Sequence, residues 1–470
     1  MSDEIGAAEP LIYEVPFSAD EVLRALLDLP PRRRVSILDS CGARGQTGRF
    51  LIAGFDPRET VEARGEEIRL TQAGERAGRI FRGDALRLLD ERLTARRASL
   101  FAGGVCVATF SYELAHRLEP SLLKARRPAS DEPDVTLAFY DALVVHDYRE
   151  GSTKIVCAGG ERRLKETLAA LDESLRGAQG DWDAWPHAPP SIKSNLTRDE
   201  YLAAVLSIKE HIAAGDIYQA NLTQQFTCRL APGTRPEAVF WRLRRDHPAS
   251  FAAYLCRRDD VVVSASPERF LRVTPAGGGG RIVEAWPIKG TRPRGRTTDE
   301  DAQLRAELLC SEKDRAENVM IVDLMRNDLG RVCRYGSVKV AELCALEEHP
   351  TLFHLVSRVR GRLRDDVTAG DLLRAAFPCG SITGAPKIRA MQIIGEAETA
   401  PRGLSMGAIG YFSLDGSLDL NVAIRTMTVR GSVARFNVGG GVVADSSPAL
   451  EYEESLLKAR ALVRALGGTL

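Results

Sequence analysis

The chain has no excess of charge of either sign and no hydrophobic run long enough to cross a membrane. Its 470 residues include 64 basic and 64 acidic side chains, which gives a formal net charge of zero. This balance gives no electrostatic reason to expect nucleic acid or a membrane surface as a partner. No stretch approaches the roughly 18 consecutive apolar residues of a membrane helix. The first ten residues, MSDEIGAAEP, lack the basic and apolar segments of a signal peptide, so we expect a cytoplasmic protein.

Several motifs that would assign a function directly are also missing. The nine cysteines are scattered, without C-x-x-C pairs or histidine companions. Their arrangement argues against a zinc site and a disulfide framework, and it fits reduced thiols. Neither the P-loop spacing G-x-x-x-x-G-K-[ST] nor G-x-G-x-x-G after a strand is present. A nucleotide ligand is therefore not expected.

The length of the chain suits two domains or one large composite domain. The apolar fraction of 44% and the charged fraction of 27% are ordinary for a globular protein. Residues 177–195, GAQGDWDAWPHAPPSIKSN, are rich in glycine, proline and serine and break the hydrophobic periodicity. We interpret this stretch as a linker between an N-terminal region, residues 1–176, and a C-terminal domain, residues 196–470.

The local sequence patterns predict strands and helices that alternate irregularly. Thr197 and Glu200 form a capping box for a helix that Gly215 ends. Hairpins and separate helices are typical of an α+β protein rather than of repeated βαβ units. Strands are predicted at residues 105–112, 137–145, 218–227, 250–255, 260–273, 281–289, 408–413, 418–429 and 432–439, and helices at 161–175, 197–214, 388–394, from 311 and from 448.

A glycine cluster at residues 277–280 lies between two predicted strands and supplies the positive-φ positions of a tight loop. If the loop is centred between Gly278 and Gly279, mirror pairing sets Glu268 opposite Lys289. Directly opposed residues of an antiparallel pair share a face, with Cβ atoms about 4.5–5.5 Å apart. The two side chains would then form either a catalytic pair or an ordinary cross-strand salt bridge. A one-residue bulge would break the pairing.

Two predicted helices begin with acidic residues spaced three apart. One pair is Asp314 and Glu317, and the other is Glu451 and Glu454. Acids in a first turn often serve only to complement the helix dipole, and Glu454 could pair with Lys458 four residues on. Together, however, two such pairs can provide the oxygen ligands of a Mg²⁺ site.

Glycine-rich segments and isolated polar residues provide further candidates. GSITGAPK, residues 380–387, and VGGGV, residues 438–442, can bring backbone N–H groups close to an anion. Arg425 lies in an apolar stretch and needs an anionic partner, either a ligand or an internal carboxylate. His354 lies in another apolar run, where a histidine is more often a satisfied core residue than a catalyst.

Taken together, these stretches resemble the chorismate-utilising enzymes. The resemblance is close over residues 195–470 and looser over the N-terminal part. It implies an α+β fold in which large antiparallel β-sheets pack as a sandwich with helices outside. The matching segments are GDIYQANLTQ (215–224), SPERF (266–270), PIKGTRP (287–293), KDRAE (313–317), VDLMRND (322–328), FHLVS (353–357), GSITGAPK (380–387) and the stretch at residues 445–454.

Two positions bear on which member of the family the chain resembles. Anthranilate synthase large subunits carry alanine where this chain has Lys289. Isochorismate and salicylate synthases activate water with a lysine where this chain has Gln219. The combination found here resembles the aminodeoxychorismate synthase component I branch, which makes 4-amino-4-deoxychorismate from chorismate and ammonia in the 4-aminobenzoate and folate pathway. Anthranilate synthase component I is the nearest alternative, and a non-catalytic member that only binds an aromatic ligand or a partner is another.

The resemblance implies roles for particular residues. Lys289 would attack C2 of chorismate while Glu268 protonates the C4 hydroxyl, and ammonia would then add at C4. Mg²⁺ would be held by Glu317 and Glu454, with Asp314 and Glu451 behind them. The remaining implied site residues are His354 near the ring, Thr291 lining the site, Arg425 and Tyr411 at the enolpyruvyl carboxylate, and Gly384, Gly439, Gly440 and Gly441 as backbone donors.

The resemblance also implies partners. The chain carries no glutaminase motif, so we expect ammonia to come from a separate glutamine amidotransferase subunit that docks on it. Leu38, Asp39 and Ser40 resemble the segment that binds tryptophan in anthranilate synthases. Aspartate stands where that group usually has glutamate. The segment is therefore expected to be either a tryptophan pocket or a decayed regulatory one.

Overall fold

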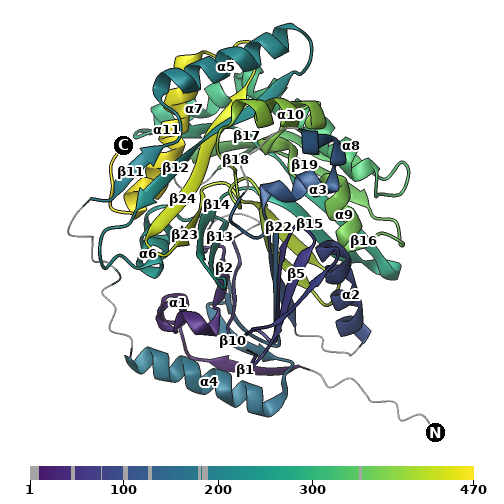
Figure 1. The fold of residues 1–470 in the computed structure, drawn as a ribbon, viewed down its shortest axis with the longest axis vertical. Coiled ribbons are helices and arrows are strands. Elements are labelled where there is room, and N and C mark those ends of the chain that lie inside the picture. Colours follow the sequence, from purple (N-terminus) through teal and green to yellow (C-terminus); the bar gives the residue numbers. More distant parts are fainter. Residues whose placement is uncertain are drawn as a thin grey trace.

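Two large antiparallel β-sheets form the centre of the protein (Figure 1). The computed structural model describes residues 10–43, 48–75, 77–98, 104–124, 130–177, 182, 189–348 and 352–470. The first sheet has the order β1 (Leu11–Val15), β10 (Ser152–Cys157), β9 (Ala142–Asp147), β3 (Phe50–Gly54), β2 (Ser36–Asp39), β13 (Phe251–Cys256), β14 (Val261–Ser266), β23 (Thr426–Arg430), β24 (Val433–Val442), β12 (Gln219–Arg229) and β11 (Ser191–Ser194), with β20 (Gly384–Ala385) pairing β12.

The second sheet is built in the same way from both halves of the chain. Its order is β17 (Ile288–Pro293), β19 (Leu352–Arg362), β16 (Gly280–Trp286), β15 (Arg269–Ala276), β22 (Leu418–Val422), β21 (Ala408–Ser413), β7 (Val105–Phe110), β8 (Val135–Tyr140), β4 (Glu59–Arg64), β5 (Glu67–Gln72) and β6 (Arg79–Arg82), with β18 (Lys339–Glu348) pairing β19. Each sheet therefore combines a block of strands from before the expected linker with a block of strands from after it. Residues 178–181 and 183–188 of that linker lie outside the described residues, and the domain division stays a prediction.

Helices cover the outer faces of the sheets, and the predicted α+β sandwich with helices outside is confirmed. One large core cluster joins the first sheet to helices that include α1, α6 and α11, and another joins the second sheet to α2, α8 and α9. A smaller cluster of residues from both sheets fills the space between them. The helices are α1 (Ala19–Asp28), α2 (Ala85–Ala98), α3 (Ala115–Leu118), α4 (Gly160–Gly177), α5 (Arg198–Ala213), α6 (Pro236–Asp246), α7 (Thr298–Cys310), α8 (Glu312–Gly330), α9 (Ala369–Ala376), α10 (Lys387–Ala397) and α11 (Pro448–Ala465).

Local signals placed several helix ends correctly. Thr197 and Glu200 form the capping box of α5, and Gly215 takes a φ of +82° just beyond the helix. Ser311 caps α8 by accepting from the Asp314 N–H, whereas Ser447 makes no side-chain cap for α11. Caps depend on residues within one turn, so the sequence alone predicts them well. No described helix is both long enough and apolar enough to traverse a bilayer.

Four predicted strands are each broken into two. The breaks after β8, β14 and β22 are crossovers at which the chain leaves one sheet and enters the other. The fourth break, at Pro287, separates β16 from β17, and proline also stands at the β14–β15 break as Pro267. Proline lacks the N–H that a ladder hydrogen bond needs. Crossovers place residues at the junction of the two sheets, and Glu268 and Arg425 occupy two of them.

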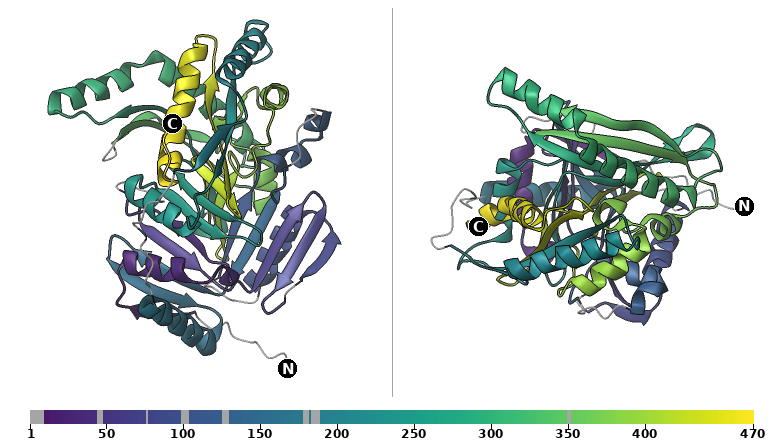
Figure 2. Two further views of the ribbon diagram at one scale, coloured as in Figure 1. Left: turned by 60° about the vertical axis from the view of Figure 1, so that its left-hand side comes forward. Right: turned by 90° about the horizontal axis from the view of Figure 1, so that it is seen from above.

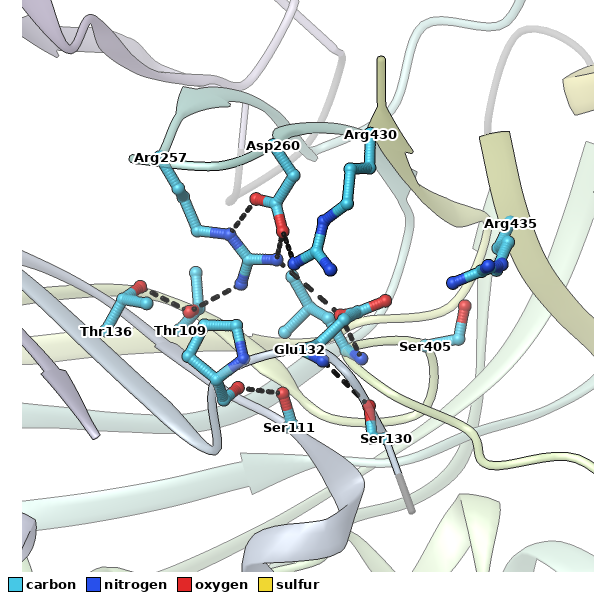
Figure 3. A network of polar contacts seen from close by, with 12 residues as sticks. Thr109, Ser111, Ser130, Glu132, Thr136, Arg257, Asp260, Ser405, Arg430 and Arg435 are labelled. Atoms are coloured by element: carbon cyan, nitrogen blue, oxygen red, sulfur yellow. Dashed lines mark hydrogen bonds and ion pairs between the residues drawn. The ribbon is translucent and has the colours of Figure 1, made fainter. Parts of the chain in front are cut away.

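A buried ion network joins the two sheets (Figure 3). Arg257 and Asp260, in the turn between β13 and β14, form a bidentate pair with N···O distances of 2.6 and 3.0 Å. Arg257 also donates to the Thr109 hydroxyl of β7, in the other sheet, at 3.3 Å. Glu132 accepts from the Leu404 N–H at 2.9 Å and lies 3.6 Å from Arg257. The network therefore fixes the turn that carries Leu404.

Candidate functional site

Most predicted site residues lie on elements that meet at one end of the molecule. In Figures 1 and 2, α8, α11, β17 and β24 gather toward the end that carries α5, while α1 and α4 lie at the opposite end. α11 packs against β24, and α8 packs against both β17 and β19. The two helices and the two sheets thus bring residues from far apart in the sequence to one place.

Glu268 lies at the crossover between β14 and β15. Its carbonyl accepts from the Val422 N–H at 3.0 Å, and its own N–H donates to the Ser266 hydroxyl at 3.3 Å. Glu268 is 4% exposed, and its Oε1 atom has no hydrogen-bond partner among the described residues. The crossover therefore holds a buried carboxyl group with one oxygen free for a ligand.

Lys289 lies in a β-bulge of β17. The register of the ladder with β19 shifts by one residue between Ile288 and Thr291. Gly290 follows with a φ of +85°, and a Cβ there would lie only 3.0 Å from Asp314 Cβ on α8. Glycine is therefore needed both for the backbone conformation and for the close approach of the helix. Bulges of this kind redirect a side chain out of the regular strand pattern.

The predicted hairpin pairing of Glu268 with Lys289 is wrong. β15 and β16 do form a hairpin, but its loop is centred on Gly278, half a residue from the expected centre. The register slips again after Arg269, and Glu268 lies before the strand begins. Lys289 has left the hairpin and lies on β17, which pairs with β19. One bulge and one crossover were enough to break the mirror symmetry on which the prediction depended.

Glu268 and Lys289 are neighbours all the same. Burial raises the pKa of Glu268 to about 7, and the Ser381 hydroxyl, the Lys289 ammonium and the Ile288 N–H act against that shift. A carboxyl group with a pKa near neutrality exchanges its proton readily at physiological pH, which suits a general acid. The tertiary structure thus brings an acid and an amine together by a route other than the predicted one.

Four acidic side chains of α8 and α11 interact with one another. Burial raises the pKa of Glu317, and the carboxylates of Asp314 and Glu451 raise it further. Burial also raises the pKa of Glu451, and Glu454 adds to that shift. Against the effect of burial, Lys458 instead lowers the pKa of Glu454. Acids gathered in this way concentrate negative charge, which a divalent cation would relieve.

Lysine side chains lie among these acids. Lys458 Nζ is 2.7 Å from Glu454 Oε1 and donates to the Gly439 carbonyl at 2.9 Å. Lys313 Nζ lies 4.0 Å from Glu317 Oε1. Within the described ranges, no three histidine, cysteine or acidic side chains converge as a metal-binding group. The donor set still fits Mg²⁺, because that ion needs only one or two protein carboxylates when water and an anionic ligand complete its shell.

The glycine-rich end of β24 faces the acids of α11. A Cβ on Gly440 would lie 3.0 Å from Glu451 Oε2 and 3.5 Å from Glu454 Oε1. β23 pairs with β24 only over residues 433–435, so the far edge of residues 439–441 has no strand neighbour in the described part of the chain. N–H groups on that edge can meet an anionic ligand beside the acids.

Gly384 and Gly441 both pack against Gln219. Gly384 takes a φ of +155°, and a Cβ there would lie 2.1 Å from the Gln219 carbonyl oxygen. A Cβ on Gly441 would lie 1.9 Å from Gln219 Nε2. Gln219 is 1% exposed, and its Oε1 has no partner among the described residues. The two glycine-rich segments therefore enclose a buried amide oxygen.

Arg425 lies at the crossover between β22 and β23, with a φ of +48°. Its carbonyl accepts from the Ala265 N–H at 3.0 Å, three residues before Glu268. Burial lowers the pKa of its guanidinium, which pairs with no carboxylate among the described residues. A largely buried guanidinium without a counter-ion can bind the carboxylate of a ligand.

Tyr411 lies in different surroundings. Burial raises its pKa to about 12, and its charged neighbours are Asp419, Arg272 and Arg269 rather than Arg425. The ring packs against the cluster between the sheets, which Leu38 also contacts. Tyr411 is therefore grouped with the N-terminal segment instead of with the other predicted ligand-binding residues.

His354 and Thr291 face each other across β19 and β17. His354 Nδ1 and Thr291 Oγ1 are 2.9 Å apart. The histidine is buried and the threonine exposed. The hydroxyl of Thr291, which lies two residues after Lys289, therefore orients the buried His354 imidazole.

Asp39 already has several hydrogen-bond partners within the protein for its carboxylate. Its carboxylate pairs with Arg244 at 2.6 Å, and it accepts from the Tyr148 hydroxyl and from the Cys41 N–H, each at 2.7 Å. Its side chain is 0% exposed. Leu38 packs against the cluster between the sheets, and the buried Ser40 hydroxyl has no hydrogen-bond partner among the described residues.

Two residues with clear roles in the geometry were not singled out from the sequence. Ser381 lies inside the GSITGAPK segment, but nothing in that segment indicated that its hydroxyl would reach Glu268. Arg402 lies in an ordinary PRG turn and forms a buried ion pair with Glu398. The pair is spaced i, i+4, which is the one signal that could have drawn attention to it.

Comparison with known proteins agrees with this geometry. The chorismate binding enzyme family matches residues 37–464. Aminodeoxychorismate synthase component 1 of Bacillus subtilis (strain 168) is 36% identical over 97% of each chain. Anthranilate synthase component 1 of Pseudomonas aeruginosa is 34% identical over 97% of this chain and 95% of its own.

Solved structures show the same fold. The crystal structure of anthranilate synthase component I from Streptococcus pneumoniae superposes with a TM-score of 0.76 and 28% identity, covering 90% of this chain and 93% of that one. An isochorismate synthase from Escherichia coli shares the fold at a TM-score of 0.67 and 16% identity, over 98% and 95% of the two chains. The family match covers most of the chain, and the full-length relatives exceed 30% identity. The chain therefore belongs to the chorismate-binding enzyme family.

Proposed function

We propose that this protein aminates chorismate at C4, forming 4-amino-4-deoxychorismate from chorismate and ammonia. The observation that carries the proposal is the meeting of Lys289, in a strand bulge, with Glu268, a buried carboxyl group of pKa about 7. Relatives named for C4 amination and relatives named for anthranilate synthesis match at 36% and 34% identity, so similarity alone does not choose between them. Lys289 favours C4 amination, because it can serve as a covalent nucleophile.

The first half of the reaction would remove the C4 hydroxyl. The neutral amine of Lys289 attacks C2, the ring double bond shifts, and the C4–O bond breaks. Glu268 gives its proton to the departing oxygen, which leaves as water. The lysine nitrogen loses a proton to solvent and remains bonded to C2. Glu268 must be protonated and Lys289 unprotonated at the start.

The second half would reverse the allylic shift. Ammonia attacks C4, the double bond moves back, and the C2–N bond to Lys289 breaks. The lysine nitrogen takes up a proton as it leaves, and the new C4 ammonium can give one to the Glu268 carboxylate. The net change is replacement of the hydroxyl by an amino group with release of one water.

Substrate binding would use the groups that surround this pair. Arg425, which has no internal counter-ion among the described residues, is proposed to bind the enolpyruvyl carboxylate. Tyr411 was expected to share that role, but its different neighbours leave Arg425 as the better-supported residue. The backbone donors proposed around the ring are those of Gly384, Gly439, Gly440 and Gly441, with His354 and Thr291 lining the site.

The acidic group is proposed to hold Mg²⁺, with Glu317 and Glu454 as ligands and Asp314 and Glu451 behind them. A bound Mg²⁺ would neutralise the ring carboxylate and draw electron density toward it. Lys458 orients Glu454 through its contacts with the Glu454 carboxylate and the Gly439 carbonyl.

A partner subunit is part of the proposal. The relatives are named component 1, which fits a second component that supplies ammonia. We propose a glutamine amidotransferase as that partner and 4-aminobenzoate for folate as the end use of the product. Residues 196–470 contain every residue of the proposed reaction site. Leu38, Asp39 and Ser40 form a separate segment, where the contacts of Asp39 favour a decayed regulatory pocket over a tryptophan site.

One assay tests the proposal. The purified chain is incubated with chorismate, Mg²⁺ and ammonium, and the products are separated by mass, with and without an added aminodeoxychorismate lyase. We expect 4-amino-4-deoxychorismate without the lyase and 4-aminobenzoate with pyruvate when it is present. Anthranilate and pyruvate without the lyase would assign the protein to the alternative reaction, and absence of Mg²⁺-dependent turnover would indicate a non-catalytic member.

A further inference from the structure

Arg402 is one of the two largest fully buried side chains among the described residues, with 2% exposure. Its Nε and Nη2 atoms pair with the two Glu398 carboxylate oxygens at 2.9 and 2.7 Å. Nη1 donates to the Ile382 carbonyl at 2.8 Å, and Nη2 donates to the Asn221 carbonyl at 2.6 Å. The guanidinium therefore links the end of α10 to two further segments of the chain.

The counter-ion Glu398 is itself held by β12. Its Oε1 accepts from the Thr223 N–H and from the Thr223 hydroxyl, each at 2.8 Å. The Arg402 guanidinium also stacks on the Tyr112 ring, 4.4 Å from its centroid. A buried pair with this many hydrogen bonds has one well-defined geometry, since any other arrangement would leave polar groups unpaired.

The Ile382 carbonyl belongs to the short turn Gly380–Ile382, which also carries Ser381. β12 holds the same turn a second time, because the Asn221 N–H donates to the Thr383 carbonyl at 2.7 Å. Arg402 binds the turn on one side of Ser381, and the Ser381 hydroxyl reaches Glu268 on the other. A continuous set of contacts thus runs from Arg402 to the acid.

We propose that Arg402 is a positioning residue that fixes the Gly380–Ile382 turn so that Ser381 hydrogen-bonds Glu268 in the orientation needed for proton donation. The inference rests on the proposed function, in which Glu268 is the general acid. Arg402 itself touches neither substrate nor reacting atoms. Its effect is exerted through the Ile382 carbonyl and the Ser381 hydroxyl.

Three other charged or titratable groups act on Glu268 and must stay constant in a test. They are Lys289 from β17, Lys458 from α11 and Cys379, the residue just before the turn. None of these three residues takes part in the hydrogen bonds between Arg402 and Glu398. A change that follows substitution of Arg402 can therefore be traced to the turn.

The test compares Arg402→Lys, Ser381→Ala and the double variant through the pH dependence of kcat/KM. Lysine keeps a positive charge beside Glu398 but cannot reach both carboxylate oxygens and both carbonyls. We expect Arg402→Lys to lower kcat by about 10- to 100-fold with little change in KM, as misplacement of a catalytic group does. The high-pH limb of the kcat/KM profile, where activity falls as pH rises, should move to higher pH in Arg402→Lys and in Ser381→Ala, because each variant loses the hydrogen bond that stabilises the Glu268 carboxylate. The double variant should show no larger shift than either single variant.

Arg242→Lys is the matched control. Arg242 is equally buried and donates to the Ala465 carbonyl at 2.9 Å, at the far end of α11 from the acids. We expect this variant to lose stability without a shift of the pH limb. If Arg402→Lys does not fold, Glu398→Gln combined with Arg402→Gln removes both charges together and serves instead.

The outcomes separate this inference from the proposed function. Product identity tests the function, whereas the pH limb is measured on whichever product forms. If no product forms, the Glu268 carboxyl titration is followed by infrared difference spectroscopy in the same variants. A limb or titration that stays in place in Arg402→Lys, or that moves equally in Arg242→Lys, would overturn the positioning role.

Discussion

Lys289 and Glu268 lie on separate segments that never pair with each other, and still the lysine ammonium lowers the pKa of the buried acid. Glu268 is held at a crossover between the two sheets, and Lys289 projects from a bulge on a strand of the second sheet. Both features are irregular points of the fold. Irregular backbone is often found where a side chain must be directed into a site.

The first prediction concerns the nucleophile. Lys289→Ala should lower ammonia-dependent C4 amination by at least about a thousandfold, because the covalent intermediate cannot form. Mass spectrometry of the wild-type protein quenched during turnover should show a lysine adduct, and the variant should lack it. Lys165→Ala, at a lysine 78% exposed on α4, is the control and should retain full activity. Full C4 amination by Lys289→Ala would rule out the nucleophile role.

The second prediction follows from the pKa of Glu268. The proton donor is active only when protonated, so kcat/KM should fall as pH rises through about 7. Glu268→Gln should lose most of its activity, and the kcat/KM that remains should no longer fall as pH rises through about 7. If kcat/KM still falls at the same pH in Glu268→Gln, the titration of another group must cause the fall.

The free energy of unfolding should also depend on pH, in the direction set by the raised pKa of Glu268. The pKa of Glu268 is raised on folding from 4.5 to about 7, so the folded state binds more protons between these values and becomes less stable as pH rises through them. Glu268→Gln removes that contribution and should be more stable than wild type by roughly 3 kcal/mol at pH 8. The difference should vanish near pH 4. Urea unfolding at the two pH values measures it, and a difference independent of pH would contradict the assigned cause.

The third prediction concerns Mg²⁺. Glu317→Gln and Glu454→Gln should each raise the Mg²⁺ concentration needed for half-maximal activity by at least about tenfold, since each removes one carboxylate ligand. Glu312→Gln and Glu453→Gln, exposed neighbours on the same two helices, should leave it unchanged. Titration of activity with Mg²⁺ at fixed chorismate makes the comparison. If both pairs of variants raise the required Mg²⁺ concentration equally, the overall negative charge of the two helices, and not Mg²⁺ ligation, is responsible.

The fourth prediction concerns the N-terminal segment. Arg244, Tyr148 and Cys41 already engage the Asp39 carboxylate, so we expect millimolar tryptophan to leave the reaction rate unchanged. Asp39→Asn should destabilise the protein by about 3 kcal/mol, because Arg244 would lose its buried charge partner and keep only the exposed Asp20. Asp20→Asn removes an exposed contact to the same arginine and should cost less than about 1 kcal/mol. Inhibition by tryptophan would show that this ion pair opens to a ligand.

Local signals in the sequence determined much of the framework. Thr197, Glu200 and Gly215 specify the ends of α5 through contacts within one turn. The i, i+3 spacing of Asp314 with Glu317, and of Glu451 with Glu454, placed each pair on one helix face wherever the helix lies. The segments that resemble the family contained the acid, the amine and the four acids of the proposed metal site. Arg425, Tyr411 and residues 439–441 lie outside those segments, and the charged neighbours of Tyr411 do not include Arg425.

The tertiary structure alone decided how Glu268 and Lys289 meet. Strand register depends on single-residue insertions and on which of two sheets a strand joins, and neither follows from hydrophobic alternation. A bulge at Lys289, a crossover at Glu268 and a loop centred on Gly278 replaced the predicted hairpin geometry. Ser381 and Arg402 were missed for the same reason, since their contacts join segments far apart in the chain. The sequence by itself named the acid and the amine, and long-range strand pairing placed them together.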